Sequence, residues 1–248
     1  MDTYKQFAQI YDELINEDIN YEKWSNIIID EVDNNGIGKI DYLDLACGTG
    51  NLTIEIAEKF RNIWAVDLSE DMLMEAYDKL KSKGIKAKLV CQNICQLNLN
   101  KQFDLITCSL DSINYIINDN DIKNLFLNIA NHLKPNGIFV FDINSYYKLT
   151  EILGNNTFNY DNDEVVYIWE NNIENDILEM YLTFFVKNER DNIYKRFDEE
   201  HIERAYKEEY IEKLIMDSGL VILNKIDNYE PKCINEKTER IVYFVKKI

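Results

Sequence analysis

Long apolar runs are missing from this sequence of 248 residues. No stretch approaches the roughly 20 apolar residues that a helix needs to span a bilayer, so we expect no transmembrane helix and no membrane partner. The N-terminal residues lack a basic segment followed by an apolar core, and we therefore expect no secretory signal. Hydrophobic residues still make up 46% of the chain, which is enough for the core of a large globular α/β domain.

Cysteines and basic residues are also few. The five cysteines are irregularly spaced, which argues against a disulfide framework and indicates a reducing, cytoplasmic environment. Cys91 and Cys95 have no nearby histidine, so we expect no metal site. The net charge is −18 and no lysine- or arginine-rich run is present, which disfavours a nucleic-acid partner because binding phosphates requires many cations. Nothing in the sequence indicates an oligomeric state.

Short β-prone apolar runs alternate with segments of helical periodicity over the first 144 residues. The predicted strands are 39–46, 62–69, 86–93, 103–110 and 137–144. The predicted helices are 4–15, 20–32, 51–60, 70–83 and 121–134. A turn is predicted at 134–137, where Pro135 and Gly137 precede the last of these strands. Strands that alternate with helices imply a parallel sheet with right-handed crossovers.

The pattern changes after residue 144, where Asn- and Asp-rich turns separate longer β-prone runs and predict an antiparallel meander. These runs are 164–171, 177–188 and 192–206. The helix and the two strands that follow them are 207–219, 220–227 and 240–246. We therefore predict an α/β domain formed by residues 1–143 and 206–248, interrupted by an antiparallel β insertion at 144–205.

A glycine-containing stretch, DLACGTGNLT, joins the first predicted strand of this domain to the helix that follows it. Glycines at this position let backbone amides approach a nucleotide-like cofactor. A P-loop is excluded, because Gly50 is followed by Asn51 rather than by a lysine and a hydroxyl residue. The dinucleotide pattern matches at Gly48 and Gly50, but Thr53 replaces its third glycine, which disfavours a dinucleotide without excluding it.

Two acidic residues near this loop indicate a different cofactor. A carboxylate at Asp44, four residues before Gly48, would repel a pyrophosphate but suits an ammonium or sulfonium group. Asp67 ends the second predicted strand, where a carboxylate can accept hydrogen bonds from both hydroxyls of a ribose. An amino acid joined to adenosine, with a cation and no phosphate, fits both residues. S-Adenosyl-L-methionine has this chemistry and is the cofactor that we expect.

The sequence resembles the class I S-adenosylmethionine-dependent methyltransferases over residues 40–143. Five blocks occur in the family order: YLDLACGTGNLTIEIAE, IWAVDLSEDMLMEA, AKLVCQNICQL, FDLITCSLDSINYI and HLKPNGIFVFDIN. Ala46 occupies the usual first glycine of the family's loop, and Asn93 stands where many members have an aspartate. The resemblance implies a Rossmann-like, doubly wound, mostly parallel seven-stranded sheet, with the antiparallel insertion forming a lid.

The resemblance also implies roles for individual residues. The loop from Ala46 to Gly50 would lie under the methionine part of the cofactor, and Asp67 would bind its ribose. Leu68 and Met72 would flank the adenine, Asn93 and Ile94 would contact its edge, and Leu110 would border the methyl-transfer channel. The implied cofactor-binding residues are Asp44, Ala46, Cys47, Gly48, Thr49, Gly50, Asp67, Leu68, Met72, Asn93, Ile94 and Leu110.

The segments IYDELINEDINYEKW and KRFDEEHIERAY resemble a narrower group that methylates small molecules and includes several amino-sugar N-methyltransferases. In that group the N-terminal tyrosine, here Tyr11, faces the cofactor or the acceptor. Tyr11 and His201, which lies on the predicted lid, are the candidate catalytic residues. The candidate acceptor-binding residues are Tyr11, Asp111, Ser112, Tyr115 and Arg196. We expect a small-molecule acceptor, and the acidic composition favours an amine and hence N-methylation over O-methylation.

Three alternatives stay open at this point. An NAD(P)-dependent oxidoreductase would share the fold, an RNA methyltransferase would share the cofactor, and a binding protein without activity would share both. The motif DSINY departs from the D/N-P-P-Y pattern of enzymes that methylate planar amino groups, which disfavours such acceptors. Cys108 is expected to be a buried structural residue, and His132 an exposed structural residue at the end of a helix.

Overall fold

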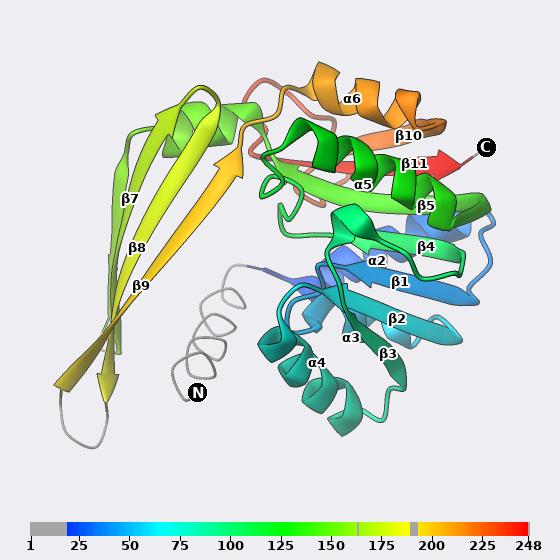
Figure 1. The fold of residues 1–248 in the computed structure, drawn as a ribbon, viewed down its shortest axis with the longest axis horizontal. Helices are drawn as coiled ribbons and strands as arrows, with labels where there is room; N and C mark the ends of the chain where they lie inside the picture. The colour runs from blue at the N-terminus through cyan, green and yellow to red at the C-terminus, as the bar shows by residue number, and fades with distance from the viewer. Residues whose placement is uncertain (1–18, 163, 189–192, 248) are drawn as a thin grey trace.

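The computed structural model describes residues 19–162, 164–188 and 193–247. The molecule contains two sheets, one of seven strands and one of four (Figure 1). The predicted helix at 4–15, which includes Tyr11, lies outside the described residues. Within the described ranges, no helix is long and apolar enough to cross a bilayer.

The seven-stranded sheet has the strand order β10-β11-β5-β4-β1-β2-β3. Its parallel strands are β1 (Asp41–Leu45), β2 (Asn62–Asp67), β3 (Ala87–Cys91), β4 (Phe103–Cys108) and β5 (Leu133–Asn144). The strands β10 (Leu220–Asp227) and β11 (Arg240–Lys247) complete it in antiparallel orientation beside β5. This topology confirms the predicted Rossmann-like, mostly parallel sheet of seven strands.

Helices cover both faces of this sheet. Successive side chains of a strand point to opposite faces, so Tyr42 and Leu43 on β1 belong to two separate apolar clusters. Tyr42 packs in the cluster that contains the buried residues of α2 and α3, and Leu43 in the cluster that contains those of α5 and α6. The helices are α2 (Tyr21–Asn34), α3 (Asn51–Ala57), α4 (Glu70–Ser82), η1 (Ile94–Gln96, a 3₁₀-helix), α5 (Asp119–His132), η2 (Lys148–Leu153, a π-helix) and α6 (Glu208–Asp217).

The segment 134–137, predicted as a turn, lies within β5 as an irregularity of the strand. Phe103 pairs with Leu133 and Leu105 pairs with Ile138, so the segment adds extra residues to one side of the ladder. A Cβ atom at Gly137 would lie 3.0 Å from the carbonyl oxygen of Phe103, a distance that only glycine avoids. The turn-forming residues therefore produce a bulge here, because the chain stays hydrogen-bonded to β4 instead of leaving the sheet.

The four-stranded antiparallel sheet consists of β6 (Thr157–Asp161), β7 (Val165–Glu174), β8 (Ile177–Asn188) and β9 (Ile193–Arg204). Asn175 and Asp176 join β7 to β8 in a two-residue turn with positive φ angles of 51° and 63°. Asparagine and aspartate tolerate this conformation, which suits the twist of a hairpin. The sheet stands beside the end of the seven-stranded sheet from which β5 leads into η2 (Figure 1). Since β5 runs parallel to β4, β1, β2 and β3, this is the end where all five finish.

Candidate active site

A cavity of about 1290 Å³ lies between the two sheets. One side is formed by residues that follow β1, β2, β3 and β4, and the other by residues of β7, β8 and β9. Ligands of open α/β sheets bind at the carboxyl ends of the parallel strands, and the cavity occupies that position. The predicted site residues that line it are Asp44, Ala46, Cys47, Gly48, Thr49, Asp67, Leu68, Met72, Asn93, Ile94, Leu110, Asp111, Ser112, Tyr115 and His201.

The loop after β1 has the backbone conformation that its glycines predict. Gly48 and Gly50 have positive φ angles of 54° and 80°, and Ala46 adopts a positive φ of 49° at the position where the family resemblance implies a glycine. A Cβ atom at Gly50 would lie 3.2 Å from the Cβ of Ala76 on α4, so this glycine allows close packing and does not line the cavity. By contrast, a Cβ atom at Gly48 would meet no atom within 4 Å. The loop therefore keeps space free at the cavity wall.

Asp44 lies at the end of β1 with only 2% of its surface exposed. Its two carboxylate oxygens accept hydrogen bonds from the hydroxyls of Thr53 and Thr107, the latter at 2.7 Å. Burial raises the pKa of Asp44 to about 6, although these hydrogen bonds lower it. Thr53, at the third position of the glycine pattern, thus holds the carboxylate in place. Each oxygen can accept a further hydrogen bond from a cationic group in the cavity.

Asp67 ends β2 and connects two neighbouring segments. Its Oδ2 accepts the backbone N–H of Gly48 at 2.8 Å, and its Oδ1 accepts the N–H of Ser69 at 2.9 Å. The hydroxyl of Ser69 accepts the N–H of Met72 and caps α4. Asp67 is therefore oriented by backbone donors and is not the helix cap, while its side chain lines the cavity.

Asn93 lies at the start of η1, where its Oδ1 accepts the N–H of Cys95 at 2.8 Å. This contact orients the planar amide and uses one lone pair of its oxygen, which leaves the NH₂ and the second lone pair for a ligand. Ile94 lines the cavity beside it. Cys95 and Cys108 are buried free thiols, as the sequence predicts for Cys108.

The loop after β4 is held by two residues that the sequence reasoning missed, Asp142 and Arg240. Leu110 and Asp111 have positive φ angles of 58° and 48°, and their N–H groups donate to the Asp142 carboxylate at 3.0 and 2.8 Å. The Arg240 guanidinium, whose side chain is 12% exposed, pairs with Asp142 and, at 2.6 Å, with Asp111. Asp111 therefore has a cationic partner within the protein. The acidic residue within the apolar run GIFVFDIN is the sequence signal for Asp142, but nothing there identifies Arg240 as its partner.

The inner face of the four-stranded sheet closes the cavity opposite the loops. Its lining side chains, from three strands, are Tyr167, Trp169, Met180, Leu182, Phe184, Glu199, His201 and Glu203. The Nδ1 atom of His201 lies 3.4 Å from the hydroxyl of Tyr115. Burial lowers the pKa of His201, so its imidazole is neutral at pH 7. The indole N–H of Trp169 is buried and has no hydrogen-bond partner among the described residues.

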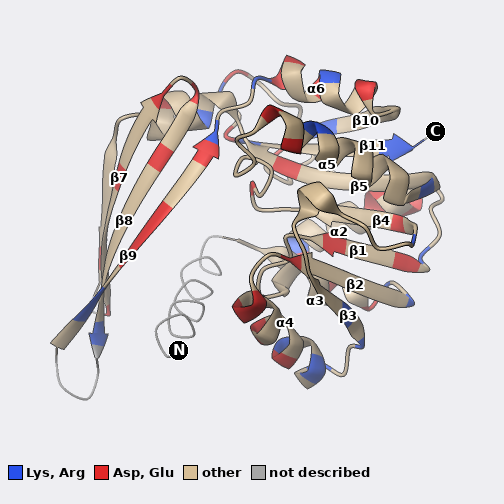
Figure 2. Cartoon of the chain, viewed as in Figure 1, with Lys and Arg blue, Asp and Glu red and all other residues tan. Residues whose placement is uncertain are grey.

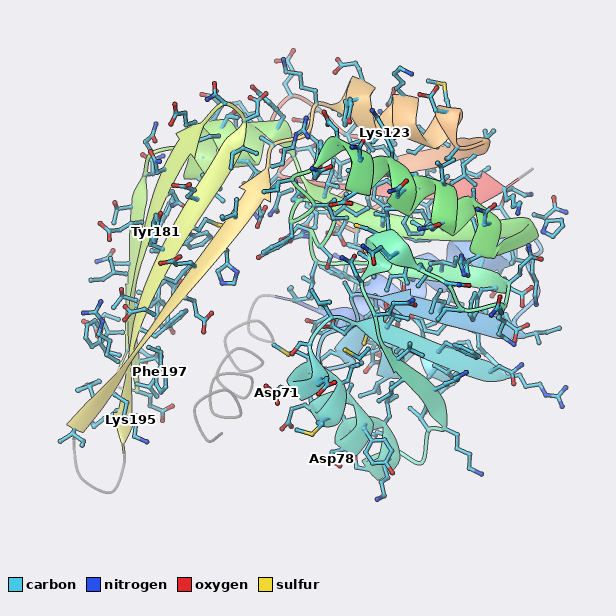
Figure 3. The ribbon with its side chains drawn as sticks, viewed as in Figure 1. Asp71, Asp78, Lys123, Tyr181, Lys195 and Phe197 are labelled. Carbon is cyan, nitrogen blue, oxygen red and sulfur yellow. The ribbon has the colours of Figure 1, made fainter. Side chains whose placement is uncertain are left out.

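Arg196, a candidate for acceptor binding, is not among the cavity-lining residues. Its guanidinium pairs with Asp198 at 2.7 Å on an exposed part of β9. Lys195 and Phe197, on either side of it in sequence, lie toward the end of the sheet that is distant from β5 (Figure 3). The structure therefore gives Arg196 a neighbouring carboxylate as partner rather than a place at the cavity.

His132 is buried, so the expectation of an exposed side chain was wrong. Its Nε2 accepts the N–H of Leu99 at 3.1 Å, and its Nδ1 donates to the carbonyl of Asn128 at 2.7 Å. Both ring nitrogens are thus engaged inside the helix–sheet interface. No group of three or more potential metal ligands occurs within the described part of the chain.

Comparison with known proteins gives the family. A family model described as a methyltransferase domain matches residues 43–137. The protein named "Putative methyltransferase GWCH70_2453" from Geobacillus sp. (strain WCH70) is 30% identical over 99% of this chain and 100% of its own. The crystal structure of an S-adenosylmethionine-dependent methyltransferase from Clostridium acetobutylicum ATCC 824 is 56% identical, with a TM-score of 0.93 over 98% of both chains.

The fold and the cavity at the carboxyl ends of the strands define an α/β methyltransferase. The chain belongs to the S-adenosylmethionine-dependent methyltransferases (EC 2.1.1.-), and its cofactor is S-adenosylmethionine. The oxidoreductase alternative is thereby removed, as is that of a protein without activity.

The likeness to amino-sugar enzymes is more distant than the sequence segments suggested. The structure of CalS10, an amino pentose methyltransferase from Micromonospora echinaspora, is 14% identical, with a TM-score of 0.79 over 96% of this chain and 97% of its own. At this identity the likeness concerns the fold alone. The protein is therefore not assigned to that narrower group.

The cavity has a first wall, formed by the residues that follow β1 to β4, and a second wall, formed by β7, β8 and β9. The residues of the first wall fit this cofactor chemically. The carboxylates of Asp44 and Asp67 flank a loop whose glycine at position 48 leaves room for close approach. Two carboxylates would repel a phosphate, whereas they suit a ligand with an ammonium group, a sulfonium group and a ribose diol. The two carboxylates and the glycine loop thus agree with the family assignment.

Proposed function

We propose that this enzyme transfers the methyl group of S-adenosylmethionine to a small-molecule acceptor, with nitrogen favoured over oxygen. The observation that supports this proposal is that one cavity is bordered by the glycine loop and by the inner face of the four-stranded sheet. A cofactor at the first wall leaves the second wall for an acceptor. The segment 144–205 would then be the acceptor-binding insertion and lid.

The cofactor would be held by the residues that line the first wall. Asp67 would accept hydrogen bonds from the ribose, Asp44 would attract the cationic amino-acid part, and Leu68 and Met72 would flank the adenine. Asn93 would contact the adenine edge through its free NH₂ or its second lone pair. The bound cofactor supplies an electrophilic methyl group, and the protein supplies alignment and exclusion of water.

The charge of the cavity favours an amine as the acceptor. Acidic residues occur along β9 (Figure 2), and Glu199 and Glu203 of that strand line the cavity. An amine needs only to arrive neutral to act as a nucleophile, whereas an alcohol needs a general base. The neutral imidazole of His201, next to Tyr115, would be the candidate base for an alcohol. RNA is disfavoured by the net charge of −18.

The experiment that tests the proposal has two stages. Isothermal titration with S-adenosylmethionine, S-adenosylhomocysteine and NAD should give binding of the first two and none of NAD. The enzyme with S-adenosylmethionine is then screened against matched primary amines and alcohols, and S-adenosylhomocysteine release is measured. Faster release with amines supports the proposal. Release with alcohols alone, or only with RNA, would overturn the preference for nitrogen or for a small molecule.

A further inference from the structure

Glu203 is a buried carboxyl group that lines the cavity near the junction of the two sheets. Only 2% of its surface is exposed, and its Oε2 accepts a hydrogen bond from the amide NH₂ of Asn144 at 3.0 Å. It lies two residues after His201 on β9, so both side chains point to the same face of that strand. A buried carboxyl group at a cavity wall requires a partner, because burying an unpaired charge is costly.

Asparagine side chains fix the position of Glu203. Asn114, in the loop after β4, donates to the carbonyl groups of Asn144 and Arg204, and its Oδ1 accepts the N–H of Asn144 at 3.0 Å. Lys148 at the start of η2 donates to the Oδ1 of Asn144 at 2.9 Å, which orients the NH₂ of Asn144 toward Glu203. The carboxyl group is therefore held by the loop after β4, the end of β5 and the end of β9 together.

The surroundings of Glu203 favour its protonated, neutral form but also contain groups that stabilise the ionised carboxylate. Burial, and then the carboxylate of Asp111, raise the pKa of Glu203 well above its usual value. The hydrogen bond from Asn144 and the cations Lys148 and Arg240 oppose this rise. Such a group can change its protonation state near neutral pH. Burial lowers the pKa of the neighbouring His201, which favours its neutral form.

We propose that Glu203 is the acceptor-binding group of this enzyme: its carboxylate binds the ammonium of the acceptor amine and takes one proton from it. This inference rests on the proposed N-methyltransferase activity. The proton passes from the ammonium nitrogen to Glu203, and the amine lone pair then forms the new N–C bond as the S–C bond of the cofactor breaks. The sulfide leaves with the bonding electron pair, the methylated product carries the positive charge, and Glu203 releases its proton to solvent after the product departs.

Benzylammonium is a suitable probe for this site, and benzyl alcohol is its uncharged counterpart. The aromatic side chains of Tyr167, Trp169 and Phe184 line the same wall and offer a surface for the ring. Both probes are titrated into the enzyme saturated with S-adenosylhomocysteine. We expect the wild-type protein to bind benzylammonium at least roughly tenfold more tightly than benzyl alcohol, and Glu203→Gln to remove this preference. Glu200→Gln is the matched control, because Glu200 is exposed on the opposite face of β9.

The pH dependence provides a second readout. Affinity of the wild type for benzylammonium should rise between about pH 6 and 8, as Glu203 loses its proton. Glu203→Asp should retain this dependence and Glu203→Gln should lose it, and unchanged S-adenosylhomocysteine binding shows that each variant is folded. Either of two results would overturn the assignment of Glu203. In the first, the wild type binds benzylammonium and benzyl alcohol equally well. In the second, Glu203→Gln binds benzylammonium as tightly as the wild type does. Methylation of alcohols alone in the screen would instead overturn the proposed N-methyltransferase activity.

Discussion

The two walls of the cavity differ in whether their buried polar groups have hydrogen-bond partners. On the seven-stranded sheet, Asp44 is held by two threonine hydroxyls, and Asp142 accepts from two backbone N–H groups, Tyr229 and Arg240. On the four-stranded sheet, the indole N–H of Trp169 has no partner among the described residues. A satisfied wall is preorganised without its ligand, whereas an unsatisfied one is completed by a ligand. The wall proposed to bind the cofactor is therefore built into the fold, whereas the wall proposed to bind the acceptor keeps a buried donor that a ligand can satisfy.

The largest expected effect concerns Arg240, which pairs with two carboxylates at the wall formed by the seven-stranded sheet. Arg240→Ala removes the cation that pairs with Asp142 and Asp111, and both carboxylates lose the charge that they are paired with. We expect the free energy of unfolding to fall by about 3–5 kcal/mol in urea titrations. Lys246→Ala, on the half-buried end of the same strand, is the control and should change stability by less than about 1 kcal/mol. Equal losses of stability in both variants would mean that the ion pairs of Arg240 are not the cause of the loss.

A second prediction separates the cofactor side from general stability. Asp67→Ala removes the acceptor of the N–H groups of Gly48 and Ser69 as well as the proposed ribose ligand. We expect the dissociation constant for S-adenosylhomocysteine to rise about tenfold to a hundredfold, because hydrogen bonds to a charged group are lost. The control is Asp71→Ala at the exposed start of α4 (Figure 3), which should bind normally. If the affinity of Asp67→Ala is unchanged, the proposed position of the ribose is wrong.

The pH dependence of cofactor binding sharpens the comparison further. Burial raises the pKa of Asp44 to about 6, so its carboxylate becomes neutral as the pH falls through that value. Binding of S-adenosylmethionine should weaken below about pH 6, by up to roughly tenfold per pH unit, and Asp44→Asn should bind weakly at every pH. A wild-type profile that stays flat between about pH 5 and 8 would show that Asp44 does not interact with the cationic cofactor.

The raised pKa of Asp44 affects folding stability in the opposite direction: a rise in pH strengthens cofactor binding but lowers the stability of the fold. Because the pKa of Asp44 in the folded protein lies above its ordinary value of 3.8, ionisation of Asp44 disfavours folding as the pH rises from about 4 to about 6. Asp44→Asn should therefore be no less stable than the wild type at pH 7, in contrast to Arg240→Ala. Thermal unfolding at pH 5 and pH 7 measures this difference, and a large loss of stability at pH 7 would contradict it.

The seven-stranded sheet and the glycine loop at its cavity wall could be predicted from the sequence because their signals are local. The alternation of strand and helix patterns gave the sheet, and the glycine loop with Asp67 lies within a short span of the chain. The pairing of Asp142 with Arg240 could not be predicted, since these residues are 98 positions apart and meet only when β11 pairs with β5.

The face of the four-stranded sheet that lines the cavity was harder to predict because its strand pattern is ambiguous. Charged residues that alternate along β9 are typical of a solvent-exposed ladder, yet His201 and Glu203 face a cavity. Arg196 on the same strand points to the exposed side, which strand periodicity alone indicates. Which face of an isolated meander is covered depends on where the second sheet lies, and the sequence of β9 does not contain that information.

The smallest expected effect is the change in stability when a buried donor without a partner is removed. Each sheet has one such donor among the described residues. The hydroxyl of Tyr243 on β11 and the indole N–H of Trp169 on β7 both lack a hydrogen-bond partner among the residues described. Removing an unsatisfied donor relieves its desolvation cost, so Tyr243→Phe should leave stability unchanged or raise it by about 1 kcal/mol. Trp169→Phe should likewise cost little stability beyond a small loss of packing.

Only the donor at the cavity should affect activity. Trp169 lines the cavity, so its N–H can donate to a bound acceptor, whereas Tyr243 is buried in the core of the seven-stranded sheet. With an amine from the acceptor screen, Trp169→Phe should raise KM several-fold, because one hydrogen bond to the acceptor is lost, and Tyr243→Phe should not. Equal kinetics in both variants would mean that Trp169 is an unsatisfied donor of the fold like Tyr243. The difference between the two walls would then rest on the carboxyl groups of β9 alone.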